Sequence, residues 1–457
     1  MSIYNEGVKT NIIDPVYFSN QRAEFRLESD SVYLSNWRLL NIGVTGAVGS
    51  KTYSGITGAI ACIKNIALYD NNVLLDQILD VPKWCGFKSF NNSNADSQDL
   101  ESNLRKSRMG SCVQGYDTVA NGSETRIDEW EVRPALTGIN GGTALGTYPK
   151  DGDRAFLRLK EVFPLLNNLN GFVDTSVFRE LKVVVEFSDD HTEFLKSDDA
   201  PLQMVQPLLV VDEVVSDESK SRVGGFSGTT YFSIENDRVI VPAITTASGV
   251  ISNVIPKPIQ QRTFNINGFN NKTVGRMLIA KTPLNPATYT NGGSVDKVGQ
   301  NGSSGMMEEE FQMRVGGSSV LAGRGITKES ERLAYLNDTW GTCSVPPFVS
   351  GGTAFFALDN VNRGSIILGG DKDLNVTDYI GLNVGKYVES LEIDYQRVGN
   401  YIFPNAGTPP PDTAGKTAND GFTDASPLNQ ALQLNIFCEV RKAIVPVAGG
   451  GYSVVYN

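Results

Sequence analysis

The stretch IKNIALYDNNVLLDQILDVPKWCGF, residues 63–87, changes its hydrophobic pattern in the middle. Residues 63–69 are rich in branched and aromatic side chains and predict a β-strand. After a turn of Asp and Asn residues, the apolar side chains are spaced as on one face of a helix. Residues 73–81 are therefore predicted to be helical, with Pro82 ending the helix. The apolar face of this helix would consist of Leu74, Leu75, Ile78 and Leu79.

Short strand-like runs dominate the rest of the chain. They are separated by turns rich in Gly, Asn and Ser, which favours a β-sandwich or a barrel over alternating βαβ units. Helix-like segments are few. They are residues 73–81, the segment KEVFPLLNNLNGF at residues 160–172, and a possible turn at residues 328–338.

A charged and then glycine-rich segment, SDESKSRVGGFSG at residues 216–228, has the composition of an exposed linker. Since about eight strand candidates lie on each side of it, two similar β-domains are predicted, residues 1–216 and 217–457. Three long connections are rich in Asn, Gly, Ser and Thr, and loops of this length are uncommon in compact domains unless they are functional or packed. They are residues 91–153, 285–307 and 405–427.

The composition is that of a folded protein, with 40% hydrophobic and 20% charged residues in a chain of 457. A formal net charge of -11 does not give the positive field of a protein that neutralises phosphates, so direct binding of nucleic acid is not expected. No apolar run approaches the roughly 20 residues of a membrane span. The first residues, MSIYNEGVKTNIIDP, show no secretory signal, which predicts synthesis in the cytosol.

His191 is the only histidine, so a Ser-His-Asp or Cys-His mechanism would have to use it. It lies in the acidic segment FSDDHTEFLKSDD, which predicts an exposed loop rather than a catalytic site. The five cysteines lack the paired spacing of a zinc site and are expected to be reduced and mostly buried. They are Cys62, Cys85, Cys112, Cys343 and Cys438.

Four further segments match a functional motif in part. VGGSSVLAGRGIT at residues 315–327 is glycine-rich but lacks the Walker spacing, and it predicts a tight connection after a strand. DKDLN at residues 371–375 copies the start of a calcium loop without its glycine and closing glutamate, which leaves a loose cation site open. The acidic run 308–310 predicts the solvated start of a strand, and Asp151 and Asp153 predict a turn. No catalytic residue, cofactor-binding residue or metal ligand is predicted.

The order of the segments along the chain is informative. The first half contains IKNIALYDNNVLLDQI, PKWCGFKSFNNSNAD, FLRLKEVFPLLNNLNGF, FRELKVVVEFSDD and PLLVVDEVV. The second half contains RTFNINGFNNKTVGRMLIAKT, EEEFQMRVGGSSVL and ESLEIDYQRVG. In this order they resemble the double jelly-roll major capsid proteins of Polinton-like viruses and virophages, which are relatives of the adenovirus hexon. The resemblance covers the chain from about residue 20 to residue 445.

The resemblance implies an all-β fold of two tandem eight-stranded jelly rolls with long loops and a few short helices. In the first roll, the helix at residues 73–81 would cover one side of the sandwich. The strand before it would contribute Ile63, Ile66 and Leu68 to the core. Three aromatic residues would anchor the start of the long loop, namely Trp84, Phe87 and Phe90.

The resemblance also implies a major capsid protein of a DNA virus, a structural subunit without enzymatic activity or cofactor. Its homotrimers would form pseudo-hexagonal capsomers that tile an icosahedral shell. Its partners would be copies of itself, neighbouring capsomers, and penton and minor capsid proteins, with no sequence-specific binding of nucleic acid; an internal membrane is left open. The protein would be made in the host cytoplasm and reside in the virion. The long loops, with aromatic residues such as Trp130 and Tyr148, would interlock between neighbours or form the outer surface.

Two alternatives stay open. A soluble β-sandwich protein that recognises carbohydrate or another surface ligand would use the same strands and loops, with an aromatic platform for the ligand. An enzyme on a β-scaffold is the third possibility, which the lone His191 and the absence of metal-site spacing disfavour. A stable trimer would favour the capsid subunit, and a monomer retained by a sugar column would favour the binding protein.

Overall fold

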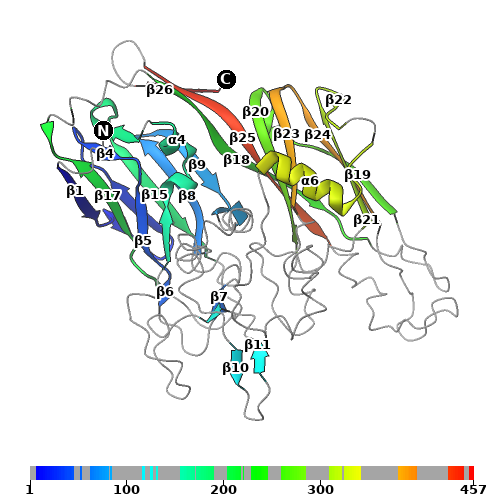
Figure 1. Ribbon diagram of the computed structural model, residues 1–457, viewed down its shortest axis with the longest axis horizontal. Coiled ribbons are helices and arrows are strands. Elements are labelled where there is room, and N and C mark those ends of the chain that lie inside the picture. The colour runs from blue at the N-terminus through cyan, green and yellow to red at the C-terminus, as the bar shows by residue number, and fades with distance from the viewer. Residues whose placement is uncertain are drawn as a thin grey trace. The chain divides into compact units, whose positions relative to one another are not determined.

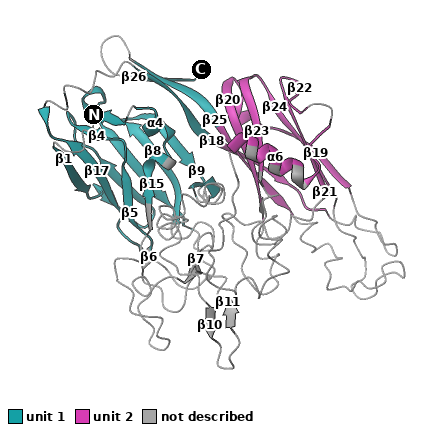
Figure 2. Cartoon of the chain, viewed as in Figure 1, with its two compact units in different colours: residues 1–89, 96–235, 439–457 teal, residues 90–95, 236–438 magenta. Residues whose placement is uncertain are grey.

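The computed structural model of the chain shows many strands and few helices among the residues that it describes (Figure 1). The described residues are 7–45, 52–53, 62–81, 83–84, 116–118, 124–126, 130–131, 155–169, 171–189, 203–217, 220, 228–244, 259–284, 308–321, 324–340, 379–398, 431–446 and 452–456. They group into two compact units, coloured teal and magenta in Figure 2. Unit 1 comprises residues 1–89, 96–235 and 439–457, and unit 2 comprises residues 90–95 and 236–438.

Unit 1 contains two main sheets, in which neighbouring strands run antiparallel. The first has the order β1-β17-β5-β13, with β4 beside β17 and β14 beside β4. Its strands are β1 (Val8–Ile13), β4 (Val32–Leu34), β5 (Arg38–Ile42), β13 (Ala155–Arg158), β14 (Phe172–Asp174) and β17 (Leu208–Val214). The second has the order β2-β3-β15-β8-β9. Its strands are β2 (Tyr17–Phe18), β3 (Arg22–Arg26), β8 (Ile63–Asp70), β9 (Val73–Leu79) and β15 (Leu181–Phe187).

Two further sheets follow in the second half of the chain. One has the order β18-β25-β20-β23, and β26 also pairs with β25. Its strands are β18 (Thr229–Val241), β20 (Lys272–Pro283), β23 (Tyr379–Val388), β25 (Leu432–Pro446) and β26 (Tyr452–Tyr456). The other has the order β19-β24-β21-β22. Its strands are β19 (Ile259–Asn265), β21 (Glu308–Val315), β22 (Ser318–Ser319) and β24 (Leu391–Val398).

Three short strand pairs complete the described strands. They are β6 (Val44–Thr45) with β16 (Gln203–Met204), β7 (Thr52–Tyr53) with β12 (Trp130–Glu131), and β10 (Tyr116–Thr118) with β11 (Glu124–Arg126).

The four main sheets repeat one topology. When the eight principal strands of each half are counted in chain order, the first half gives the sheet orders 1-8-3-6 and 2-7-4-5. The second half gives the same two orders, with β18 as its first strand and β25 as its eighth. Two four-stranded antiparallel sheets connected in this way are a jelly roll. The predicted fold class, two tandem eight-stranded jelly rolls, is confirmed.

The predicted helix in the opening stretch is wrong, because residues 73–79 form strand β9. β9 pairs with β8, but the register shifts between Leu68 and Tyr69, where β9 has one extra residue. This β-bulge leaves both Leu75 and Asp76 buried instead of alternating between core and solvent. The resulting spacing of apolar residues imitates the face of a helix.

The predicted core positions of strand β8 are confirmed. Their side chains are at most 2% exposed, and they are Ile63, Ile66 and Leu68. The register of β15 against β8 places Val183 opposite Leu68 and Val185 opposite Ile66, and both valines are fully buried. Trp84 is also buried, as expected of an anchor, whereas Phe87 and Phe90 lie outside the described residues.

The helical prediction for residues 160–172 is confirmed in part. The segment contains η4 (Leu159–Glu161) and α4 (Pro164–Asn167), and strand β14 then begins at its last residue. Two other short 3-10 turns are described, η5 (Thr175–Val177) and η7 (Asn267–Phe269).

The segment predicted as a turn at residues 328–338 contains α6 (Glu329–Trp340), the longest of the described helices. The Glu331 carboxylate accepts hydrogen bonds from the backbone N–H groups of Thr327 (3.0 Å) and Lys328 (3.2 Å), which caps the start of the helix. The helix packs on β23, where a Cβ at Gly381 would lie 2.9 Å from Cδ1 of Trp340. Glycine is therefore required for this close approach.

We expect Gly381→Val to lower the free energy of unfolding by about 1–3 kcal/mol, because the added side chain would displace α6 from β23. Chemical denaturation followed by circular dichroism measures the change. Tyr335→Ala, on the exposed side of α6, is the matched control and should cost less than about 1 kcal/mol. Equal losses in the two variants would contradict the packing of α6 against Gly381.

Candidate functional site

Most of the candidates for chemistry lie outside the described residues. They are Cys85, Cys112, Asp151, Asp153, His191, Cys343 and the segment 371–375. Cys62 and Cys438 are described as reduced, buried thiols, as predicted for them. Burial raises the pKa of the Cys62 thiol, so this sulfur stays protonated and unreactive in the core.

The glycine-rich segment 315–327 returns along strand β21, as a tight connection does. Ile326 forms an isolated bridge with Phe311, and the N–H of Gly325 donates to Oε1 of Glu310 at 3.2 Å. A Cβ at Gly325 would lie 2.5 Å from the carbonyl oxygen of Phe311. A glycine is therefore needed at this position for the two backbone segments to approach each other. Its N–H group already donates a hydrogen bond to the Glu310 carboxylate.

The acidic run 308–310 differs from the prediction at its middle residue. Glu309 is buried, with its side chain facing Lys281 and Arg332. Its Oε2 lies 2.6 Å from Nζ of Lys281 and 3.2 Å from Nη1 of Arg332, and Tyr395 donates its hydroxyl to Oε1 at 2.5 Å. The prediction of a solvated carboxylate is wrong for Glu309, because its cationic partners come from β20 and from α6.

The Glu309 cluster has the properties of a structural contact. Lys281 comes from β20 in one sheet, and Glu309 and Tyr395 come from β21 and β24 in the other, so the ion pair joins the two sheets. Burial and the neighbouring carboxylate raise the pKa of Tyr395 well above its usual value, so its hydroxyl remains a donor. All of these side chains are withdrawn from solvent, and the Glu309 carboxylate is bound by Lys281, Arg332 and Tyr395, so the cluster presents no reactive group to a substrate.

A second buried cluster, in unit 1, surrounds Asp76 of strand β9. Its carboxylate accepts hydrogen bonds from the hydroxyl of Ser233 (2.7 Å) and the backbone N–H of Leu165 in α4 (3.0 Å). The side chain of Lys442 approaches from β25 and bonds the hydroxyl of Ser233 (3.2 Å). Burial raises the pKa of Asp76 to about 6. The cluster thus contains a carboxyl group that can change its charge near neutral pH.

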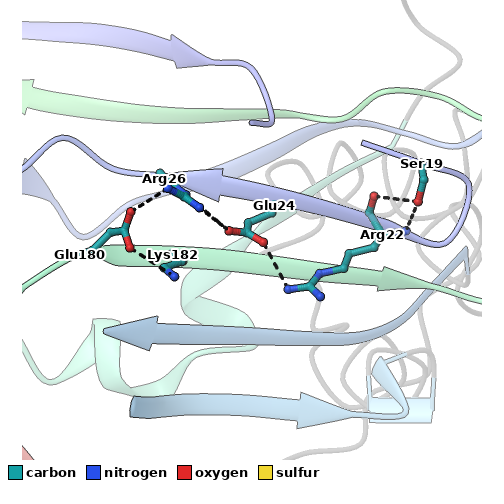
Figure 3. Close-up of polar contacts among 6 residues, drawn as sticks. All are labelled: Ser19, Arg22, Glu24, Arg26, Glu180 and Lys182. Atoms are coloured by element: carbon teal, nitrogen blue, oxygen red, sulfur yellow. Dashed lines mark hydrogen bonds and ion pairs between the residues drawn. The ribbon is translucent and has the colours of Figure 1, made fainter. Parts of the chain in front are cut away.

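Figure 3 shows a row of alternating charges on β3 and at the start of β15 in unit 1, in which Arg22 and Arg26 are exposed and the other three side chains are partly buried. Glu24 lies 3.2 Å from Arg22 and 3.4 Å from Arg26. Glu180 lies 3.1 Å from Arg26 and 3.2 Å from Lys182. Because each of these three bases has a carboxylate beside it, the face presents no row of unneutralised cations to a phosphate backbone.

In the part of the chain that the structure describes, no group of three or more His, Cys, Asp or Glu side chains is arranged to hold a metal ion. None of the helices described has the length and apolarity that crossing a bilayer would require.

Exposed apolar side chains gather at one corner of each roll. The corner, as we use the word, is the end of a roll's first strand together with the start of the next strand along the chain, which is β2 in unit 1 and β19 in unit 2. In unit 1 it carries Ile12 (65% exposed), Val16 (58%) and Tyr17 (54%), and in unit 2 it carries Ile240 (54%) and Ile259 (67%). These five are the most exposed large hydrophobic residues in the described part of the chain.

The sequence analysis does not predict the apolar corners, although the sequence contains one pattern that indicates the corner of unit 1. Val16 and Tyr17 follow Ile12 and Ile13 after Asp14 and Pro15, so apolar residues continue through a segment with turn residues. Contiguous apolar patches on a protein surface mark sites of interaction with another protein, a membrane or a ligand. The segment at residues 12–17, however, has the same composition as a buried strand. Only the exposure of its side chains in the structure distinguishes it from one.

The two repeated strand orders define the class to which this fold belongs, the double jelly roll. The structure is similar to VP54 of PBCV-1, whose crystal structure was fitted into a cryo-EM reconstruction of the virophage Sputnik. The TM-score is 0.51 and the identity 10%, over 98% of this chain and 97% of that chain. It is also similar to the mavirus major capsid protein, with a TM-score of 0.50 and 12% identity over 100% of this chain and 91% of that chain. At these identities the likeness shows the fold. No family model and no curated protein matches the sequence.

We expect Glu309→Gln to lower the free energy of unfolding by about 3–5 kcal/mol, because it removes the buried carboxylate that Lys281 and Arg332 share. Glu24→Gln makes the same chemical change in the β3–β15 row, where its partners Arg22 and Arg26 are exposed, and should cost about 1 kcal/mol or less. The denaturation midpoints of both variants and the parent measure the difference. A small effect of Glu309→Gln would contradict the role of this carboxylate in joining the sheets.

Proposed function

We propose that the chain is a major capsid protein, a non-enzymatic subunit that forms homotrimeric capsomers and, through them, an icosahedral virus shell. The observation that carries the proposal is the repetition of one roll topology twice within a single chain. Three copies arranged around a three-fold axis would provide six similar walls, and the resulting pseudo-hexagonal tile would pack edge to edge. The likeness over the whole chain to the mavirus major capsid protein supports this proposal.

In this proposal each roll forms one wall, and the chain divides into its two rolls at residues 216 and 217. The charged and glycine-rich segment 216–228 would serve as the linker. It begins two residues after β17, the eighth strand of the first roll, and ends just before β18, the first strand of the second roll.

The apolar corners are where we place contacts between neighbouring copies. Because the same corner is apolar in both rolls, each roll would meet the next in a similar way, as six similar walls require. Removing these side chains from water would stabilise the contact by roughly 25 cal/mol per Å² of apolar area. The long connections 91–153, 285–307 and 405–427, with Trp130 and Tyr148, would extend this contact or form the outer surface.

The charge distribution supports an outer shell that does not grip the genome. The net charge of -11 opposes nonspecific binding to phosphates, and the bases of the β3–β15 face are paired with carboxylates. Further partners would be penton and minor capsid proteins. The subunit would be made in the host cytoplasm and would reside in the virion.

We expect purified protein to elute as a stable species of three times the chain mass of 49.5 kDa in size-exclusion chromatography with light scattering. Negative-stain images should show hexagonal tiles or shells. A monomer that binds to a sugar column would contradict the proposal and favour the soluble β-sandwich binding protein.

Charges introduced at the corners should prevent the association of copies, because an ionised side chain would be buried in an apolar contact. We expect Ile12→Asp and Ile259→Asp each to shift the trimer to monomer, while circular dichroism shows an unchanged fold. Tyr387→Asp, at a residue 52% exposed on β23 outside the corners, is the matched control and should remain trimeric. A trimer that tolerates both corner variants would place the contact elsewhere.

A further inference from the structure

The two apolar corners differ in the sign of the charge that lies beside them. In unit 1, Asp14 lies between Ile12 and Val16, and its side chain is exposed. In unit 2, the exposed Arg238 lies two residues before Ile240 on β18, and therefore on the same face of that strand. Among the residues that the structure describes, no other charged residue lies within two positions of the exposed apolar side chains of either corner.

Both charges are available to a partner. Oδ1 of Asp14 accepts a hydrogen bond from the neutral side-chain amide of Gln206 at 3.2 Å, and no cation in the described part of the chain pairs with it. The neighbour of Arg238, Asp237, points to the other face of β18. Its carboxylate accepts the backbone N–H groups of Arg238 (2.7 Å) and Gly268 (3.2 Å). The Arg238 guanidinium itself has no carboxylate partner among the residues described.

The charges further away do not alter this difference between the corners. Lys9 and Arg262 each lie three residues from an exposed isoleucine of a corner, on the opposite face of the strand. Because both are cations, they affect the two corners alike. Glu24, on the strand paired with β2, is bound by two arginines of the β3–β15 row. Arg397, on the strand paired with β19, is fully buried and presents no charge to the surface.

The symmetry of a closed ring decides which surfaces can meet. In a three-fold ring, one surface of a copy contacts a different surface of the next copy, whereas a two-fold dimer brings the same surface together with itself. The corners of units 1 and 2 are two different surfaces that are both apolar and carry opposite charges. Asp14 against Arg238 would therefore attract, while either residue against its own copy would repel.

We propose that, in the capsomer, the corner of unit 1 in one copy binds the corner of unit 2 in the next copy, with Asp14 facing Arg238 across the contact. This inference rests on the proposed function and adds to it the direction of the contact and the residues that specify it. The apolar side chains would supply the attraction. The two charges would select this head-to-tail contact over a two-fold dimer, which would occupy a corner without closing a ring.

Charge reversal tests the contact in the full-length protein, with sedimentation velocity as the measurement. Asp14→Arg would place two guanidinium groups against each other, and Arg238→Glu would do the same with two carboxylates. Each should raise the protein concentration at which half of the trimer dissociates by at least about tenfold. Reversal of both charges in one chain should restore the trimer. Asp338→Arg, on the exposed side of α6, is the matched control and should associate as the parent does.

A mixture of the parent with the doubly reversed variant gives a second measurement. The corners of this variant carry charges opposite to those of the parent, so any contact between the two proteins would place like charges together. Native mass spectrometry after dissociation and reassembly, with the parent isotopically labelled, should therefore show trimers of one kind each. Mixed trimers in statistical proportions would overturn the proposal.

The outcomes separate this inference from the proposed function. A parent that remains a monomer would contradict the capsid subunit, and this contact with it. A trimeric parent that tolerates both single reversals, or a double reversal that does not restore the trimer, would overturn the pairing of Asp14 with Arg238 alone. Both positions are exposed, so circular dichroism should show an unchanged fold. If one single variant does not fold, the other carries the same expectation.

Discussion

Each roll depends on the pairing of its first strand with its eighth, β1 with β17 and β18 with β25. This contact joins residues that are about 200 positions apart, as the hydrogen bond between Thr10 and Asp212 illustrates. Such distant pairings are slow to form, because the entropy of closing the loop is lost before the contacts exist. Once they form, however, each roll is completed by its last strand. In the second roll that strand is β25, whose final residues continue into unit 1, so both units receive part of their structure from the end of the chain.

A buried carboxylate secures a helix to a sheet in both rolls. In unit 1, Asp76 on β9 accepts the backbone N–H of Leu165 in α4. In unit 2, Glu309 on β21 binds the guanidinium of Arg332 in α6 at 3.2 Å. Both carboxylates belong to the sheet of order 2-7-4-5, although they occupy different strands of it. A charge withdrawn from water is tolerated only with its partners in place, so these contacts favour one position of each helix over its alternatives.

The sequence predicts correctly those structural features that depend on residues close together along the chain. The strand containing Ile63, Ile66 and Leu68 was predicted correctly, because its alternation needs no knowledge of its partner. β9 was not, because the bulge at Leu75 exists only through pairing with β8. The sequence predicts only a turn where α6 lies. The reason is that the buried Arg332 occupies a position where an apolar residue would have continued the helical spacing of Leu336 and Trp340. The burial of Glu309 depends on Lys281, which lies 28 residues earlier on another strand.

The candidate interaction sites were likewise identified from the exposure of side chains and not from sequence motifs, because exposure depends on contacts between residues that are distant in the sequence. On the outer face of β3 and β15, charges are already paired within the chain, so a partner would gain little by approaching it. At the corners, Ile12 and Ile259 are exposed to water, and each would gain about 1–2 kcal/mol on burial. A single contact of this size would be weak. In a closed ring, however, each copy would use both of its corners at once, so association would become strong only when the ring is complete.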